Sequence, residues 1–155
     1  MRPPSLCLQN AFTLIELVFV IVLLGIVSIT AIPKMFNNNQ FEQRAFFNDT
    51  LNAVRYAQKV AIATGCNTQV SIADDSYELL RGDTCASNNF ISSVPHPSNG
   101  QNDYTGSQNN VSLAADHATI TFDGLGRADN DTTITVGTRT ITIIAATGFS
   151  FDSTP

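Results

Sequence analysis

Oxygen-bearing side chains gather in one short segment of the carboxyl-terminal third: Asp123, Asp129, Asn130 and Asp131. Carboxylate and amide oxygens are the ligands that Ca²⁺ takes in proteins. The spacing does not match an EF-hand loop, however, and no bidentate Glu follows it. The pattern therefore favours an ordinary Asp/Asn turn over a calcium site.

Residues with catalytic chemistry are sparse. His96 and His117 stand far apart and have no converging partner, so we expect solvated polar side chains rather than metal ligands. No nucleophile–base pair, phosphate-binding glycine loop or paired catalytic carboxylate appears. We predict a protein that is not an enzyme and that needs neither a cofactor nor a metal.

The length and the charge of the chain narrow the possible classes of protein further. The 155 residues predict one domain, or one domain with an appendage. Eight Lys and Arg against thirteen Asp and Glu give a formal charge of −5, and the positive charges are scattered. A nucleic-acid surface needs clustered cations to displace counterions, so no nucleic-acid partner is expected.

The apolar residues are concentrated near the amino terminus. Sixteen of the 21 residues from 12 to 32 are apolar, and as a helix they would span about 31 Å, the thickness of a bilayer core. A cleaved secretory signal would be shorter, and a buried core helix would carry polar residues at helical spacing. We predict a membrane segment. Glu16 is its one charge, and it either snorkels to the interface or has a cationic partner.

The run from Ala11 to Leu17 (Ala-Phe-Thr-Leu-Ile-Glu-Leu), behind a polar leader with Arg2, resembles the type IV prepilin signature. The resemblance implies that a prepilin peptidase removes residues 1–11 between Ala11 and Phe12 and methylates the Phe12 nitrogen. Most members of the family have Gly where this chain has Ala11. Residues 12–32 would remain as the transmembrane and assembly helix. Gly25 in this segment and Pro33 just after it match helix-weakening positions of the family.

The same resemblance supplies a partner for Glu16. The new amino group of Phe12 in a neighbouring subunit would meet the Glu16 carboxylate inside the membrane and set the axial register. It also implies an inner-membrane protein with a cytoplasmic amino terminus and a periplasmic carboxyl-terminal domain that later enters a pilus. The implied partners are other pilin or pseudopilin subunits, the prepilin peptidase, the inner-membrane assembly platform and membrane lipid.

Of the three cysteines, Cys7 lies in the implied leader and would be lost on processing. Two thiols then remain in an exported domain, which favours a disulfide between Cys66 and Cys85. A metal site is the alternative, but two Cys without a close His do not complete four ligands.

The remaining chain changes its periodicity at residue 65. Residues 33–65 continue as an amphipathic half-helix whose apolar stripe runs from Phe47 to Ala61, and the helix should end at Thr64 with Gly65 as its left-handed cap. Asn37 to Asn39, with Pro33, mark a soft spot. The nearby phenylalanines are expected to be packing residues: Phe36, Phe41, Phe46 and Phe47.

Residues 66–155 predict an extracytoplasmic β domain. A hairpin is expected from strands 68–72 and 77–80, and further strands at 118–122, 132–136, 139–145 and 149–151. Between them, 17 of the 25 residues from 86 to 110 are Ser, Asn, Gly, Pro or Gln, which predicts a loop. The expected fold is α+β, with a long amino-terminal helix packed on an antiparallel sheet.

Two carboxyl-terminal patterns refine the resemblance. The segment from Ile120 to Arg127 (Ile-Thr-Phe-Asp-Gly-Leu-Gly-Arg) resembles H-type minor pseudopilins. The helix stretch from Ala53 to Val60 and the Gly65-Cys66 junction resemble minor pilins of the mannose-sensitive haemagglutinin (MSHA) pilus. The leading hypothesis is an MSHA-type minor pilin that supports pilus biogenesis and adhesion. The alternatives are a pseudopilin of a type II secretion system or DNA-uptake pseudopilus, and a membrane-anchored periplasmic binding module.

Overall fold

The computed structural model describes residues 12–35, 38–85, 87–98 and 100–155. The chain forms two compact units that divide between Asn37 and Asn38, and each is described by itself. The implied leader, with Arg2, Cys7 and Ala11, lies outside the described residues, as do Phe36 and Asn37 at the expected soft spot.

The first unit contains one helix, α1, from Leu14 to Met35. The large apolar side chains of α1 are exposed from Leu14 to Ile26. Among the residues that the structure describes, no helix has both the length and the apolarity to cross a membrane. The membrane segment expected at residues 12–32 stays a prediction.

The second unit begins with α2, from Asn38 to Thr64. The expected apolar stripe of this helix is its buried face: Phe47, Leu51, Val54, Ala57 and Ala61. The helix ends at Thr64, and Gly65 follows with a φ of 68°, in the left-handed region that glycine adopts without a steric penalty. The buried stripe and the helix end at Thr64 with its Gly65 cap both agree with the predictions from the sequence.

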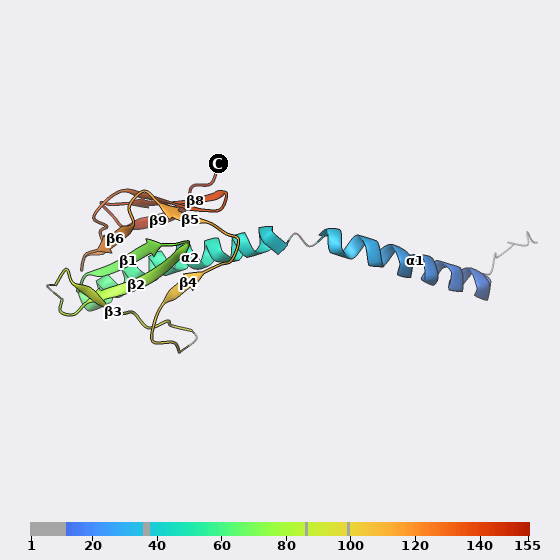
Figure 1. The fold of residues 1–155 in the computed structure, drawn as a ribbon, viewed down its shortest axis with the longest axis horizontal. Helices are drawn as coiled ribbons and strands as arrows, with labels where there is room; N and C mark the ends of the chain where they lie inside the picture. Colours follow the sequence, from blue (N-terminus) through green and yellow to red (C-terminus); the bar gives the residue numbers. More distant parts are fainter. Residues whose placement is uncertain (1–11, 36–37, 86, 99) are drawn as a thin grey trace, which may run out of the picture. The chain divides into compact units, whose positions relative to one another are not determined.

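Two antiparallel sheets pack on this helix (Figure 1). The first has the order β3-β2-β1-β6, with β4 also paired to β2, and the second has the order β5-β7-β8-β9. The strands of the first sheet are β1 (Thr68–Ala73), β2 (Ser76–Gly82), β3 (Phe90–Ser93), β4 (Thr105–Ser107) and β6 (Thr119–Phe122). The strands of the second are β5 (Leu113–Ala115), β7 (Thr132–Val136), β8 (Arg139–Ile144) and β9 (Phe149–Asp152).

The β1–β2 hairpin shows why the sequence specifies its strand register. Its two turn residues, Asp74 and Asp75, have φ values of 49° and 57°, the positive values of a two-residue type I′ turn. Val70 and Ile72 of β1 and their cross-strand partners Leu79 and Tyr77 all point inward and are buried. A slip of one residue would turn these four side chains to solvent, so the core fixes the pairing.

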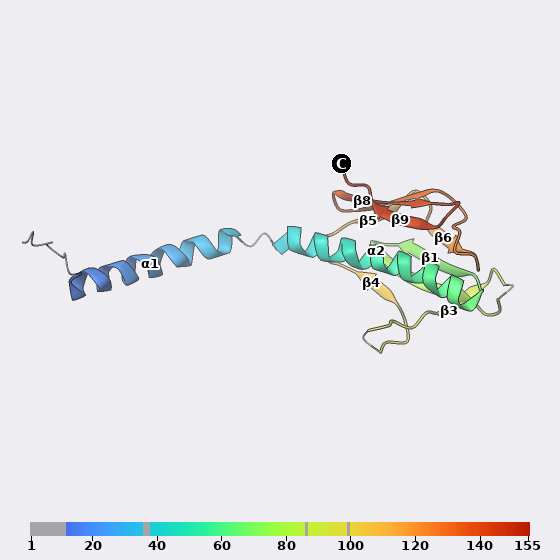
Figure 2. The same ribbon diagram turned by 180° about the vertical axis from the view of Figure 1, so that it is seen from behind.

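One core joins the helix to both sheets. Ile120 and Phe122 of the first sheet and Ile141 and Ile143 of the second are fully buried in the same cluster as Val54. Figure 2 shows α2 running along the sheets with its other side uncovered. The α+β architecture expected from the sequence, a helix packed on antiparallel sheet, is therefore confirmed.

Two expectations are wrong. The stretch 86–110 is not simply a loop, because β3 and β4 both lie in it and pair with β2. Phe41 is not a packing residue: its side chain is 77% exposed, whereas Phe46 and Phe47 are buried. Phe41 lies on the helix face that turns away from the sheets, at helical spacing with exposed Asn48 and Asn52.

Candidate assembly site

The start of α1 carries the residues that the prepilin signature singles out. The helix begins at Leu14, and the Thr13 hydroxyl accepts a hydrogen bond from the Glu16 backbone N–H at 3.3 Å. Thr13 is therefore the N-cap, and it satisfies one of the amide groups that a helix start leaves unpaired. Glu16 sits in the first turn, where the helix dipole favours a negative charge.

Sequence reasoning missed this cap although its signal is present. Thr13-Leu-Ile-Glu16 has the spacing of a capping box, in which a Thr precedes a Glu by three residues. Glu16 therefore occupies a position from which its side chain can help to cap the start of α1, in addition to any role between subunits. Phe12 directly precedes the cap and is 74% exposed.

Gly25 and Pro33 both lie inside α1, which continues through them to Met35. A Cβ added at Gly25 would meet no atom within 4 Å, so packing inside this chain does not require a glycine there. Their role as helix-weakening residues stays a prediction.

The second unit is fastened at the end of α2 by a disulfide. Cys66, two residues after α2, is joined to Cys85 in the β2–β3 connection, as the sequence predicted. The Cys66 backbone N–H also donates to the Thr64 hydroxyl at 3.3 Å. The bond therefore ties the end of the helix to a strand connection that lies 19 residues further along the chain.

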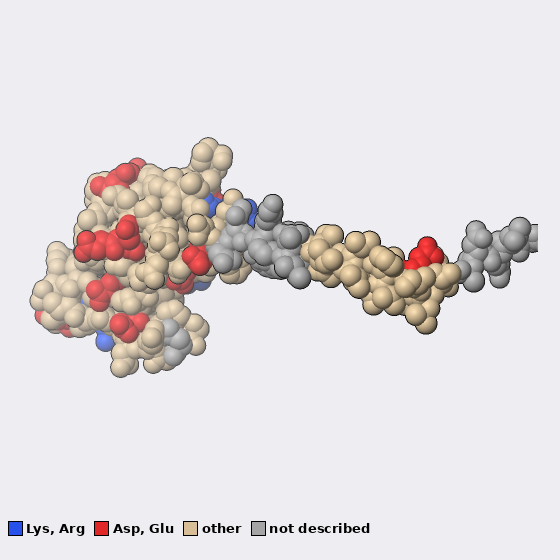
Figure 3. Space-filling view, turned by 45° about the vertical axis from the view of Figure 1, so that its right-hand side comes forward, with Lys and Arg blue, Asp and Glu red and all other residues tan. Residues whose placement is uncertain are grey.

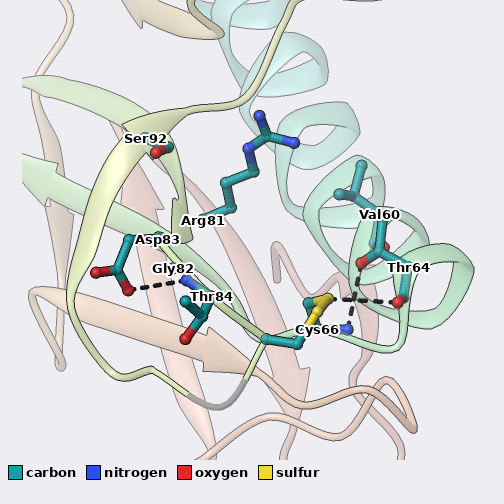
Figure 4. A pocket seen from close by; sticks show the side chains of 9 residues that line it. Val60, Thr64, Cys66, Arg81, Gly82, Asp83, Thr84 and Ser92 are labelled. Atoms are coloured by element: carbon teal, nitrogen blue, oxygen red, sulfur yellow. Dashed lines mark hydrogen bonds between the residues drawn. A yellow bond between two sulfur atoms is a disulfide. The ribbon is translucent and has the colours of Figure 1, made fainter.

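A cavity of about 270 Å³ lies beside this disulfide (Figure 4). Arg81 extends across it toward Val60 and Thr64 of α2, while Asp83 points away and accepts a hydrogen bond from the Thr84 backbone N–H at 2.8 Å. The hydroxyl of Ser87 and the Thr84 amide hold the pKa of Asp83 below its usual value. The arrangement holds the β2–β3 connection against the helix and contains no catalytic pair.

An aromatic cluster holds the 86–110 segment against α2. Tyr104 packs on Tyr56 of α2 with ring centroids 5.5 Å apart, and His96 packs on Tyr104 at 4.2 Å. The His96 Nδ1 also accepts the Ser98 backbone N–H at 3.2 Å. His96 is therefore a packed, hydrogen-bonded residue rather than the solvated one expected from sequence.

The acidic segment after β6 is a hydrogen-bonded turn. The Asp123 carboxylate accepts the Arg127 backbone N–H at 2.8 Å and pairs with its guanidinium, while Asp129 and Asp131 accept the amides of Thr121 and Ala145. Desolvation tends to raise the pKa of Asp123, but the Arg127 contacts outweigh it and lower that pKa. Within the described ranges, no three His, Cys, Asp or Glu side chains converge as a metal site.

His117 is exposed, which agrees with the expected solvated side chain, and its Nδ1 lies 3.4 Å from the Thr132 hydroxyl.

Comparison with known proteins bears on both ends of the chain. Residues 7–32 match the family model described as the prokaryotic N-terminal methylation motif. The structure is similar to crystal structures of the type IV minor pilin FimU from Pseudomonas aeruginosa strain PAO1 in two crystal forms. One superposes with a TM-score of 0.52 at 12% identity over 74% of this chain and 91% of FimU, and the other with 0.50 at 10% over 76% and 89%.

The fold is a type IV pilin fold. The methylation motif and this pilin fold therefore occur in the same chain. No curated protein sequence matches significantly. The methylation motif covers the residues on both sides of the expected cut, Ala11 and Phe12, and extends to Ile32.

Proposed function

We propose that this chain is a minor pilin of an MSHA-type pilus, which it enters through its amino-terminal helix and where it supports pilus biogenesis and adhesion. One observation carries the proposal: a methylation motif at residues 7–32 precedes a pilin-type domain in the same chain. The choice of the MSHA type rests on the resemblance of the helix stretch from Ala53 to Val60 and of the Gly65-Cys66 junction.

In this proposal a prepilin peptidase cuts between Ala11 and Phe12 and methylates the Phe12 nitrogen. The helix start supports this position for the cut, because α1 begins at Leu14 and its cap is Thr13. Processing would leave the cap and the first turn inside the mature chain. The assembly platform in the inner membrane would then take up a subunit whose apolar α1 is anchored in lipid.

The exposed apolar side chains of α1 support assembly through this helix. They run from Leu14 to Ile26 and are exposed, so lipid or neighbouring helices would cover them. The Glu16 carboxylate would meet the Phe12 amine of an adjacent subunit, which compensates two charges that are costly in lipid. Gly25 and Pro33 would let α1 bend as subunits pack.

Two other functions remain as outcomes of the test. A pseudopilin of a type II secretion system or DNA-uptake pseudopilus would share the motif and the fold, and the stretch from Ile120 to Arg127 resembles H-type pseudopilins. A membrane-anchored periplasmic binding module would need neither processing nor Glu16.

A deletion strain separates these functions. We expect the wild-type protein in sheared surface fibres, fewer fibres and weaker adhesion after deletion, and unchanged secretion and DNA uptake. Loss of secretion or uptake with normal pili would assign the chain to a pseudopilus. A protein that stays in the membrane fraction, with all three phenotypes unchanged, would favour the binding module.

A further inference from the structure

The uncovered face of α2 has an unusual composition. Seven exposed side chains recur along it at spacings of three or four residues, which places them on one side of the helix. We call this row the α2 stripe: Phe41, Arg44, Asn48, Asn52, Arg55, Lys59 and Ile62. It contains three cations and no acid.

The rest of the same unit has the opposite charge. Residues 38–155 hold twelve Asp and Glu and six Lys and Arg, and three of those six cations belong to the α2 stripe. The other three cations against twelve carboxylates leave a formal charge of −9 off the stripe. Figure 3 shows Asp and Glu groups spread over the visible face of this unit, with few cations among them.

The cations of the α2 stripe form no ion pair with a carboxylate in the described part of the chain. The ion pairs in the described part of the molecule join Arg127 to Asp123 and Arg139 to Asp152, and neither involves the α2 stripe. The Arg55 guanidinium donates to the Ser150 carbonyl oxygen at 3.0 Å, which orients it without neutralising it. Both acids of α2 lie off the stripe, and the Asp49 carboxylate is bound by the Tyr77 hydroxyl.

We infer that the α2 stripe docks the acidic surface of an adjacent subunit's globular domain in the fibre. The inference rests on the proposed function, because it takes the neighbouring pilin as the partner. The inference follows from charge complementarity: this domain carries a cationic row about 22 Å long, from Arg44 to Lys59, and a strongly acidic remainder, so a second copy of it would offer the acidic surface. Apolar Phe41 and Ile62 at its two ends add contact area of the kind that interfaces bury.

A nucleic acid fits the stripe less well. Affinity for DNA comes from several neutralised phosphates, and three cations on a domain with a −9 remainder would leave most of the duplex repelled. A protein surface with a few carboxylates is a better electrostatic complement to the three cations of the α2 stripe. Arg44 and Lys59 would then act as rim charges that select partner and orientation.

Lys59→Glu tests the stripe, with Arg81→Glu as the matched control. Both cations are exposed, neither has an ion pair among the described residues, and both substitutions change the net charge equally, but Arg81 belongs to β2 and not to the α2 stripe. We expect about fivefold less Lys59→Glu than wild-type protein in sheared fibres, and wild-type amounts of Arg81→Glu. Equal incorporation of both variants would overturn the inference.

A photo-crosslinking residue at Asn52, between the cations, identifies the occupant in purified fibres. Crosslinks to peptides from an acidic surface of a neighbouring pilin are expected, and crosslinks to nucleic acid or to no subunit would refute the inference. Thermal melting of each variant, with the Cys66–Cys85 bond checked by peptide mapping, excludes misfolding as the cause. Wild-type protein absent from fibres would instead refute the proposed function, so the two failures are distinguishable.

Discussion

The Tyr77 hydroxyl of β2 donates a hydrogen bond to the Asp49 carboxylate of α2 and so joins the sheet to the helix across the core. The Tyr77 side chain is 1% exposed and stacks on Phe46 with ring centroids 6.0 Å apart. Burial, followed by the Asp49 hydrogen bond and charge, raises the pKa of Tyr77 well above its usual value. This contact ties the β1–β2 hairpin to the middle of the helix.

Tyr77→Phe should lower the free energy of unfolding by about 1–3 kcal/mol, because it leaves a half-buried carboxylate without its donor. Urea unfolding of the full chain in detergent micelles measures the loss. Tyr56→Phe is the matched control, since it removes a hydroxyl from a ring that also packs on Tyr104. Equal losses in the two variants would show that the Asp49 hydrogen bond contributes nothing.

Alkaline pH should weaken the fold through the same residue. The pKa of Tyr77 is raised in the folded state, so the folded chain holds this proton more tightly than the unfolded chain. The resulting stability is fully present below the unfolded pKa of about 10 and is lost progressively as pH rises above it. Thermal melts at several pH values should show a larger loss of stability at alkaline pH in wild type than in Tyr77→Phe. Melting temperatures that fall in parallel with pH in the two proteins would contradict this prediction.

Loss of the Cys66–Cys85 bond should destabilise the second unit by about 3 kcal/mol, the chain-entropy value for a loop of 20 residues (85 − 66 + 1). The double variant Cys66→Ser/Cys85→Ser, compared with wild type under oxidising and reducing conditions, measures it by thermal unfolding. The reductant should shift the melting temperature of wild type only. A reductant-insensitive wild type would mean that the disulfide does not stabilise the fold.

The local features of this fold could be predicted from the sequence because their signals are local. The end of α2 at Thr64, the cap at Gly65 and the turn at Asp74 and Asp75 depend on residues within a few positions of each other. The α2 core stripe and the β7 strand at Thr132–Val136 follow from apolar periodicity.

Apart from the Thr13 cap, whose signal is local, the features that were missed depend on distant parts of the chain. β3 and β4 are only four and three residues long, too short to show a period, and each becomes a strand by pairing with β2. His96 is ordered by its contact with Tyr104, and Tyr77 by its bond to Asp49, which lies 28 positions away along the chain. No periodicity in the sequence carries that information. The proposed pairing of Glu16 involves a second subunit, so the structure of one chain cannot show it.

Glu16→Gln and Glu16→Leu should separate the two roles of this carboxylate. Gln keeps the capping-box sequence pattern with Thr13 but removes the charge, whereas Leu removes both. If the charge sets the register between subunits, both variants should insert normally, be cleaved at near-normal rates, and fail to enter sheared fibres. Incorporation of Glu16→Gln at wild-type levels would show that the Glu16 charge does not set the axial register between subunits. Helix capping would then be the role of Glu16.

The most direct test of a processed fibre subunit is the intact mass of the protein recovered from sheared surface fibres. We expect a chain that begins at Phe12, carries one methyl group on its amino nitrogen, and retains the Cys66–Cys85 bond. A chain in that fraction that still begins at Met1, or that has been cut after Ala31, would contradict it, because neither could present the Phe12 amine to a neighbour's Glu16.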